Sequence, residues 1–381
     1  MMNKPPRVYG IDWLEMFVNE SPSVDYSPEG FRRRGWEVQE REYGTKTMAQ
    51  MFVLNDQRGY PMFEIRRCPR GLDKDARSTV YTYGDSYVRL SNLYCYDSHP
   101  MRLMVDFLER ENYTIKKIYR IDVYLDIVRF DTGDIPKNVA RRIVNHTYSK
   151  VNQTERRTNG KDTWTECLDN WISWGATGSM VSTKFYCKTK EIRDSGMKKT
   201  YILENWRQKE LIDDITTIRL NGELQEVWRL EFSIKGNAKG WIVINEKESE
   251  DGARHMVPHN PQCYMEPKGV LNAIANLIPY YFKFRYYKEG VRKSNCPEKV
   301  LFKFDENEAE LGYRLTNEGD IYRVRPVVVD EELIALHHLD RAYHKLAGTS
   351  VAPKLQQVIW DVHSRVTERA RKTYTKDPDV W

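Results

Sequence analysis

The sequence has no long run of apolar residues. No stretch approaches the roughly 18–20 apolar residues that a helix needs to span a bilayer. The first residues, Met-Met-Asn-Lys-Pro-Pro-Arg, also lack the apolar core of a secretory signal peptide. We therefore expect a cytoplasmic protein that has no membrane partner.

Two kinds of cofactor motif are missing as well. The 6 cysteines are scattered, with no Cys-x-x-Cys and no cysteine–histidine cluster, which argues against structural zinc and against a disulfide framework. The glycine-containing segment at residues 175–179 is not followed by Lys-Ser or Lys-Thr, so it does not predict a P-loop nucleotide site.

The composition is that of an ordinary soluble protein, with 381 residues, 40% apolar residues and 30% charged residues. The net charge of +5 is too small to identify a nucleic-acid partner. Cationic residues nevertheless occur in groups, which is typical both of nucleic-acid contacts and of solvated surface. These groups include Arg32 to Arg34, Arg66 with Arg67 and Arg70, Arg141 with Arg142, Arg156 with Arg157, and Arg365, Arg369, Arg371 and Lys372.

Strand and helix signals alternate along the chain with mostly local connections. Residues 8–95 are typical of a β meander, and helices are expected behind Pro100, at about 136–149 and from Val270 to Pro279. Two further helices are expected at about 330–347 and 353–371. This order predicts an α+β fold, with a mostly antiparallel curved sheet, flanking helices and a helical C-terminal region.

Three strand-like segments, residues 119–126, 183–191 and 228–235, each separate apolar from polar side chains. Side chains of a strand point alternately to its two faces. If the three strands share one sheet, the polar face therefore collects carboxylates, cations and a tyrosine. The predicted polar sets are Arg120, Asp122, Tyr124 and Asp126; Lys184, Tyr186 and Lys188; and Arg229, Glu231, Ser233 and Lys235.

Tyr186 is distinguished from the other tyrosines by the lysines at positions 184 and 188. Two-residue spacing places both lysines on its own face of the strand. Cations beside a phenol can lower its pKa and can neutralise a phosphate. The alternative is an ordinary strand tyrosine, one of 24 in the chain.

Asp122, Asp126 and Glu231 are the candidate ligands for Mg²⁺ or Mn²⁺, which prefer oxygen donors. Asp122 and Asp126 would lie about 13 Å apart along a straight strand. We therefore expect Asp122 and Glu231 to share the ion, with Asp126 in reserve. Salt bridges with Arg120 and Arg229 are the competing interpretation.

In their order and spacing, the three strand segments and two further short motifs resemble those of the Rep_trans group of rolling-circle plasmid replication initiators. The relatives of that group include relaxases of integrative conjugative elements. The resemblance covers about residues 8–240. The motifs read Ile11-Asp-Trp-Leu, Arg120-Ile-Asp122 with Asp126, Gly175 with Ser179, Tyr186-Cys-Lys188 with Glu191, and Trp228-Arg229-Leu-Glu231.

The resemblance implies a DNA strand transferase that nicks and rejoins a single strand. Tyr186 would be the nucleophile, forming a 5′-phosphotyrosine and freeing a 3′-OH, with Asp122 and Glu231 holding the metal. The developing charge would be stabilised by Arg120, Arg229, Lys184 and Lys188. Residues 1–245 would form the catalytic core and 246–381 a mainly helical region, with one continuous domain as the alternative.

The expected partners are origin DNA that is single-stranded or hairpin-shaped at the nick, together with a host helicase and polymerase. The oligomeric state stays open, and a homodimer is among the candidates. Two other functions remain open: a conjugative relaxase with the same chemistry, and a DNA-binding regulator that has lost catalysis. The chain has no histidine-hydrophobe-histidine triplet, the metal motif of another large group of tyrosine nickases.

Overall fold

The computed structural model divides the chain into two compact units, residues 1–320 and 321–381. It describes residues 5–41, 48–72, 79–81, 84–145, 147–150, 156–158, 171–175, 179–243, 256–286, 290–291 and 295–317. All described residues belong to the first unit. The helices expected at about 330–347 and 353–371 therefore lie outside the described residues.

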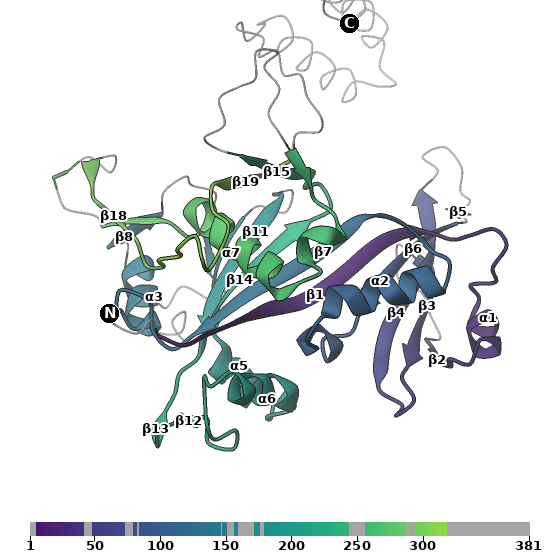
Figure 1. The fold of residues 1–381 in the computed structure, drawn as a ribbon, viewed down its shortest axis with the longest axis horizontal. Helices are drawn as coiled ribbons and strands as arrows, with labels where there is room; N and C mark the ends of the chain where they lie inside the picture. The colour runs from purple at the N-terminus through teal and green to yellow at the C-terminus, as the bar shows by residue number, and fades with distance from the viewer. Residues whose placement is uncertain are drawn as a thin grey trace, which may run out of the picture. The chain divides into compact units, whose positions relative to one another are not determined.

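An eleven-stranded sheet forms the centre of the first unit (Figure 1). Its order is β2-β3-β4-β6-β1-β7-β14-β11-β10-β9, with β5 paired to β4, and neighbouring strands are antiparallel. The predicted α+β class with an antiparallel sheet is confirmed. The strands are β1 Arg7–Asn19, β2 Glu37–Glu40, β3 Met48–Asn55, β4 Pro61–Leu72, β5 Thr79–Tyr81, β6 Asp85–Leu90, β7 Thr114–Ile127, β9 Arg156–Thr158, β10 Trp171–Trp174, β11 Val181–Cys187 and β14 Trp228–Lys235.

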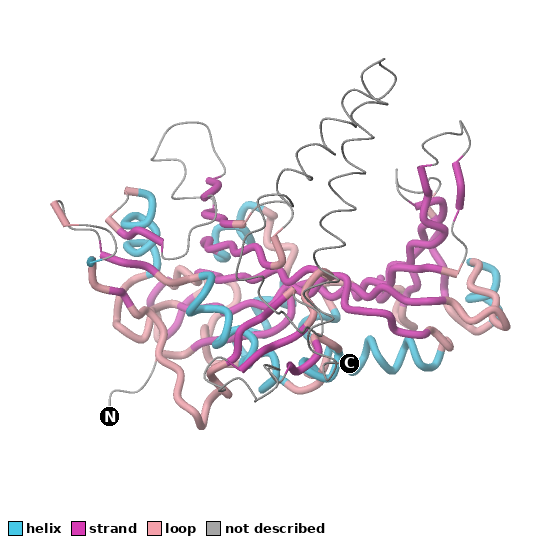
Figure 2. Tube along the Cα trace, turned by 90° about the horizontal axis from the view of Figure 1, so that it is seen from above, coloured by secondary structure: helices cyan, strands magenta, loops and turns pink. Residues whose placement is uncertain are grey.

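One face of the sheet packs against helices α2 (Pro100–Arg110), α3 (Pro136–Val144) and α7 (Pro267–Tyr281). In the view of Figure 2, α2 is drawn below the strands. The alternating apolar side chains of β7, β14 and β11 contribute to this core, as their period of two predicted. Among the described helices, none is long and apolar enough to cross a membrane.

Part of the opposite face is covered by α5 (Lys188–Asp194) and α6 (Thr200–Gln208), which form a second apolar cluster. Trp206, Ile202 and Leu203 of α6 pack there against Tyr124 and Val8 of the sheet. This cover buries the end of the polar face near the C-terminus of β7. The rest of the face remains partly open.

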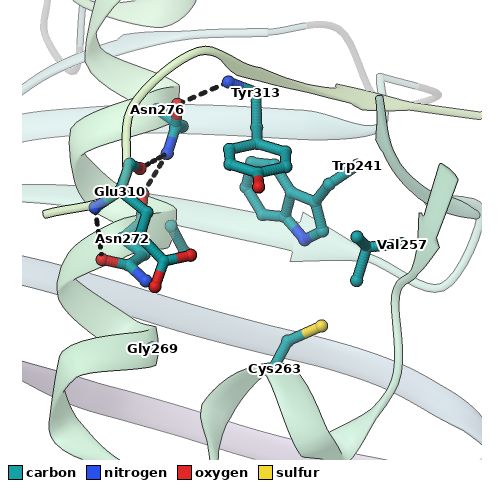
Figure 3. A pocket seen from close by; sticks show the side chains of 9 residues that line it. Trp241, Val257, Cys263, Gly269, Asn272, Asn276, Glu310 and Tyr313 are labelled. Atoms are coloured by element: carbon teal, nitrogen blue, oxygen red, sulfur yellow. Dashed lines mark hydrogen bonds between the residues drawn. The ribbon is translucent and has the colours of Figure 1, made fainter. Parts of the chain in front are cut away.

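Residues 256–317 fold with the first unit. A three-stranded sheet, β16 (Met256–Pro258), β15 (Gly240–Val243) and β19 (Tyr313–Thr316), is joined to α7. Asn276 of α7 donates to the Glu310 carbonyl at 2.6 Å and accepts from the Tyr313 amide at 2.8 Å. Figure 3 shows the adjoining pocket of about 160 Å³, which Trp241 and Tyr313 line.

The remaining elements are short. They are α1 Pro28–Arg33, β8 Tyr148–Lys150, β12 Arg219–Leu220, β13 Glu223–Leu224, β17 Phe284–Tyr286 and β18 Glu298–Lys299, with 3-10 turns at Tyr94–Tyr96 and Pro261–Tyr264. Residues 280–286 interleave aromatic with cationic side chains, and they are divided between the end of α7 and β17.

Three predicted boundaries are wrong. The helix expected at about 136–149 ends at Val144, and residues 148–150 form β8 instead. The tyrosine strand was expected to extend to residue 191, but it ends at Cys187, and α5 begins at Lys188. The helix from Val270 was expected to be interrupted or ended by Pro279, yet α7 continues to Tyr281. A proline removes its own N–H bond and crowds the carbonyl four residues earlier, so it distorts the turn before it without preventing the helix from continuing.

Candidate active site

The three predicted strands are neighbours in the sheet, in the order β7-β14-β11. Their register places Glu231 opposite Lys184 on one side and opposite Tyr124 on the other. Two residues along the same pair of strands, Asp122 lies opposite Ser233. The prediction that Asp122, Tyr186 and Glu231 share one face of one sheet is confirmed.

Tyr186 and Glu231 are in direct contact. The tyrosine hydroxyl donates to Glu231 Oε2 at 3.0 Å, while Lys184 Nζ lies 2.8 Å from Oε1 of the same carboxylate. Glu231 is 4% exposed and Tyr186 is half-buried. The carboxylate is therefore the group placed to receive the phenolic proton.

Asp122 is held by Arg120 from its own strand. The guanidinium donates to both carboxylate oxygens, at 2.8 and 2.5 Å, and Arg120 Nε also lies 3.1 Å from Ser233 Oγ. Burial raises the pKa of Asp122 above its ordinary value, the negative charge of Glu231 adds to that effect, and Arg120 opposes it. The two carboxylates thus interact electrostatically across neighbouring strands.

The donor set fits a hard divalent cation. Mg²⁺ keeps several waters and is commonly bound by one or two carboxylates together with phosphate oxygens of the substrate. Asp122 and Glu231 supply two such carboxylates on adjacent strands. Within the described ranges, no group of three or more His, Cys, Asp or Glu residues is positioned to hold a metal by itself, so substrate oxygens would have to complete the coordination.

Lys188 reaches Tyr186 from a different element than expected. As the first residue of α5, it is 2% exposed, and its Nζ lies 3.4 Å from the Tyr186 hydroxyl and 2.5 Å from Glu191. Burial lowers the pKa of Lys188, and the nearby charge of Arg229 lowers it further. Sequence reasoning gave Glu191 no role of its own, although the spacing of 188 and 191 is that of an ion pair on a helix.

The expectation that the two lysines would lower the pKa of Tyr186 is wrong for this conformation. Burial, followed by the charge of Glu231, raises that pKa well above its ordinary value. The reason is that each lysine already faces a carboxylate, Lys184 facing Glu231 and Lys188 facing Glu191. Tyr186 is therefore a neutral phenol here.

Asp126 and Arg229 form a buried ion pair, and both side chains are 0% exposed. Arg229 donates to both Asp126 oxygens at 2.7 Å, and the Trp206 indole of α6 donates to one of them, also at 2.7 Å. These contacts engage both Asp126, the reserve metal ligand, and Arg229, one of the cations predicted to contact the phosphate. Their proposed contacts with metal and phosphate stay predictions.

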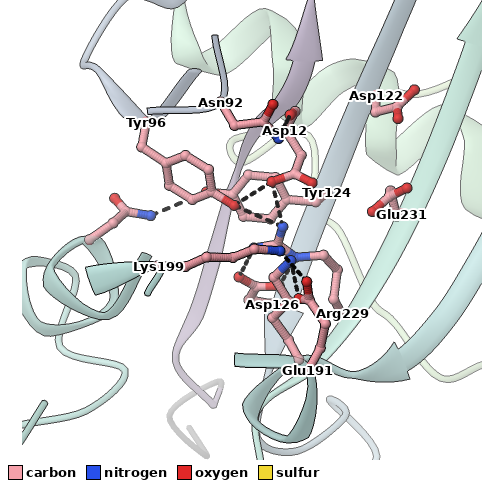
Figure 4. A network of polar contacts seen from close by, with 12 residues as sticks. Asp12, Asn92, Tyr96, Asp122, Tyr124, Asp126, Glu191, Lys199, Arg229 and Glu231 are labelled. Atoms are coloured by element: carbon pink, nitrogen blue, oxygen red, sulfur yellow. Dashed lines mark hydrogen bonds and ion pairs between the residues drawn. The ribbon is translucent and has the colours of Figure 1, made fainter. Parts of the chain in front are cut away.

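Figure 4 shows two further members of this network, Asp12 and Tyr96. The Arg229 guanidinium donates to both, at 2.8 Å each, and Tyr96 donates to Asp12 at 2.5 Å. A register shift in β1 between Ile11 and Trp13 makes Asp12 the extra residue of a bulge, which turns its side chain toward Arg229. In the sequence, Asp12 was recognised only within the Ile11-Asp-Trp-Leu motif, which gave it no role.

Tyr124 belongs to the polar face by register but is 1% exposed. The Arg229 guanidinium lies 3.9 Å above its ring, and Asn205 of α6 donates to its hydroxyl at 3.1 Å. Its β1 partner is Gly10, where a Cβ would come within 2.9 Å of the Tyr124 hydroxyl. A glycine is therefore required at that position.

Gly175, part of the motif that carries the family resemblance, ends β10 with a φ of +107°. A Cβ there would lie 3.0 Å from the backbone of Ser182 in β11. The glycine thus allows the chain to turn closely onto the tyrosine strand.

Comparison with solved structures gives a distant likeness in fold. No protein-family model and no curated protein match the chain. The chain is similar to a solved structure described as the rolling circle replication initiator protein from Geobacillus stearothermophilus, with 13% identity, a TM-score of 0.41, and coverage of 77% of this chain and 93% of that one. A likeness of this extent does not assign a function, and the proposal below is based on the site.

Proposed function

We propose that the protein nicks and rejoins a single DNA strand through Tyr186, as an initiator of rolling-circle replication. The observation that carries the proposal is the contact of the hydroxyl of half-buried Tyr186 with Glu231, beside Asp122, on a face rich in cations. A nucleophile with an adjacent base is the recurring arrangement of covalent catalysis.

The proposed step forms one bond and breaks another at the scissile phosphorus. Tyr186 Oη attacks the phosphorus, its proton passes to Glu231, and the bond from phosphorus to the 3′ oxygen breaks. The 3′ oxygen takes a proton from water and leaves as a 3′-OH, while the 5′ phosphate stays on the tyrosine. Rejoining is the reverse reaction, with the same groups.

Metal and cations would share the stabilisation of the phosphate. Asp122 and Glu231 would hold Mg²⁺ or Mn²⁺, and the ion would polarise the scissile phosphate. A phosphate that approaches Lys184 competes with Glu231 for the ammonium group, which frees that carboxylate to accept the phenolic proton. Arg120 is half-buried at the edge of the site and is placed to contact the same phosphate.

The direct experiment incubates the protein with Mn²⁺ and single-stranded oligonucleotides that tile the DNA around its gene. On a denaturing gel, wild-type protein should give a shortened strand and a protein–DNA adduct. Tyr186→Phe should give neither, while binding persists and stability changes by no more than about 1 kcal/mol, because only the hydroxyl and its contacts with Glu231 and Lys188 are lost.

Tyr60→Phe is the matched control, because Tyr60 is 52% exposed and distant in sequence from the site strands. It should nick like wild type. Binding without any adduct in wild type would contradict the proposal and favour a DNA-binding regulator. If nicking is found, a neighbouring replication origin favours an initiator, whereas a coupling-protein gene favours a conjugative relaxase.

A further inference from the structure

A broad groove of about 800 Å³ adjoins the candidate active site. It forms where β7, β11 and β14 continue past the carboxylates and reach the loop at residues 236–239. Ser182, Ser233 and Tyr119 contribute to its wall. The cations that line it are Lys117, Arg120, Lys184, Lys235 and Lys239.

The groove carries an excess of positive charge. No carboxylate is among its described lining residues, and two of its cations, Arg120 and Lys184, pair with Asp122 and Glu231 at the site. Lys117 donates to the carbonyl of Gly236 at 3.2 Å, which is a neutral partner. Such a groove favours a polyanion over an isolated small anion.

An aromatic side chain adds a second feature of single-strand binding. Tyr119 lines the groove, and its residue is 40% exposed, although it packs edge-on against Tyr87 at a centroid distance of 4.6 Å. Proteins that bind single strands combine a cationic track for the phosphates with aromatic rings on which bases stack. A duplex offers no unstacked base to such a ring.

The direction of the bound strand follows from the order of residues along the sheet. On β11, residues 182 and 184 line the groove and Tyr186 lies beyond them, while Glu231 pairs across from Lys184. A phosphate held at the carboxylates therefore has Tyr186 on one side and the groove on the other. In-line displacement directs the leaving oxygen away from the attacking oxygen, which here means toward the groove.

We propose that this groove binds the phosphates of the single strand on the 5′ side of the nick, the segment that ends in the leaving 3′ oxygen. The inference rests on the proposed function, because it takes Tyr186 as the nucleophile. It implies that the strand carrying the new 3′-OH is held noncovalently, while the other strand end is held covalently.

The test uses a double variant, Lys117→Ala with Lys239→Ala, two exposed lysines of the groove. The matched control is Lys116→Ala with Lys268→Ala, which removes the same charge from two exposed lysines outside the groove. All proteins also carry Tyr186→Phe, so that binding is measured without cleavage. The first probe is an oligothymidylate of about 20 nucleotides, titrated over a range of salt concentrations.

The groove variant should bind more weakly and depend less on salt. The negative slope of log K against log salt should become shallower by roughly 1.4, since each single-strand phosphate contact contributes about 0.7. The control should keep the wild-type slope. An unchanged slope in the groove variant, or an equal fall in the control, would overturn the groove assignment. This readout needs no nicking, so it is separate from the test of the proposed function.

The second pair of probes carries the mapped nick site near the 3′ end or near the 5′ end of the oligonucleotide. The groove variant should lose affinity for the first probe, which is mostly 5′ flank, and bind the second like the control. Equal losses on both probes, or a loss confined to the second, would contradict the proposed direction.

Discussion

The contact between the Tyr186 hydroxyl and the Glu231 carboxylate depends on burial and on the charged groups around it. Burial and the Glu231 charge raise the pKa of the phenol, and Lys184 occupies the other oxygen of the same carboxylate. In the proposed reaction, Glu231 would become free to accept the phenolic proton only when a phosphate draws Lys184 away. Substrate binding would then activate the tyrosine, which stays a neutral phenol without it.

At the same scale, Asp122→Asn or Glu231→Gln should abolish nicking. Each change removes a negative oxygen from the proposed metal site, and the second also removes the proton acceptor of Tyr186. Binding should remain, because phosphate contacts depend mainly on cations and backbone groups. The measurement compares nicking in Mn²⁺ with nicking in EDTA for wild type and both variants.

Asp106→Asn is the control for these variants, since Asp106 is exposed on α2. It should nick at the wild-type rate. Equal wild-type nicking in EDTA and in Mn²⁺ would remove a metal from the mechanism.

The face on which a side chain lies was predictable wherever the two-residue period of a strand determines it. Asp122, Tyr186 and Glu231 share a face because alternation requires it once the strands pair. Asp12 and Tyr96 were missed because a bulge in β1 and a separate loop bring them to Arg229. No local pattern encodes contacts between residues so distant in the sequence.

At the scale of elements, the Asp126–Arg229 pair joins β7 and β14 beneath α6. Arg229→Ala should lower the free energy of unfolding by about 3–5 kcal/mol, because it leaves Asp126 charged and unpaired in the interior. Chemical denaturation gives the value. Arg120→Ala, at the partly open end of the face, should lower it by far less, and equal effects of the two changes would contradict this division of roles.

The segment that follows β15 has its own pH dependence. His259 is 8% exposed, its Nε2 lies 2.9 Å from the Tyr264 hydroxyl, and burial lowers its pKa to about 4 from 6.5. The unfolded chain binds this proton at a higher pH than the folded chain does. His259 therefore contributes stability above about pH 6.5 that is lost as the pH falls toward 4.

His259→Gln should remove this dependence. Between pH 7 and pH 4, wild type should lose about 3 kcal/mol more unfolding free energy than the variant, from the size of the pKa shift. Denaturant titrations of both proteins at the two pH values give the difference. The same loss in both proteins would show that His259 does not titrate in this way.

The types of the elements were largely predictable from the sequence. Their boundaries, and the helices that cover part of the polar face of the sheet, were not. No helix was predicted at the position of α6, which forms because Ile202, Leu203 and Trp206 bury one helical side against Tyr124 and its neighbours. That packing is tertiary, so local periodicity alone did not decide it. The end of β11 at Cys187 likewise depends on α5 turning back over the sheet.

At the scale of the whole molecule, the antiparallel class followed from the order of strand and helix signals and from their local connections. The join of residues 256–317 to the first unit did not, because it depends on contacts such as those between Asn276 and the backbone near Tyr313. The boundary expected near residue 245 gave no signal of them.

The basic C-terminal segment gives a prediction at this scale. Removing residues 350–381 deletes Arg365, Arg369, Arg371 and Lys372. DNA binding should weaken and become less dependent on salt, with the slope falling by about one for each lost phosphate contact. Salt titrations of the folded truncated protein measure this, and unchanged affinity would assign the segment to packing instead.

The central claim is that Tyr186 carries the DNA, and mapping the trapped adduct tests it most directly. The protein is incubated with Mn²⁺ and a cleaved single strand, digested with protease, and the peptide that bears the nucleotide is sequenced by mass spectrometry. We predict a 5′ phosphate on Tyr186 and on no other residue. An adduct on a different side chain, or wild-type amounts of adduct in Tyr186→Phe, would contradict the account.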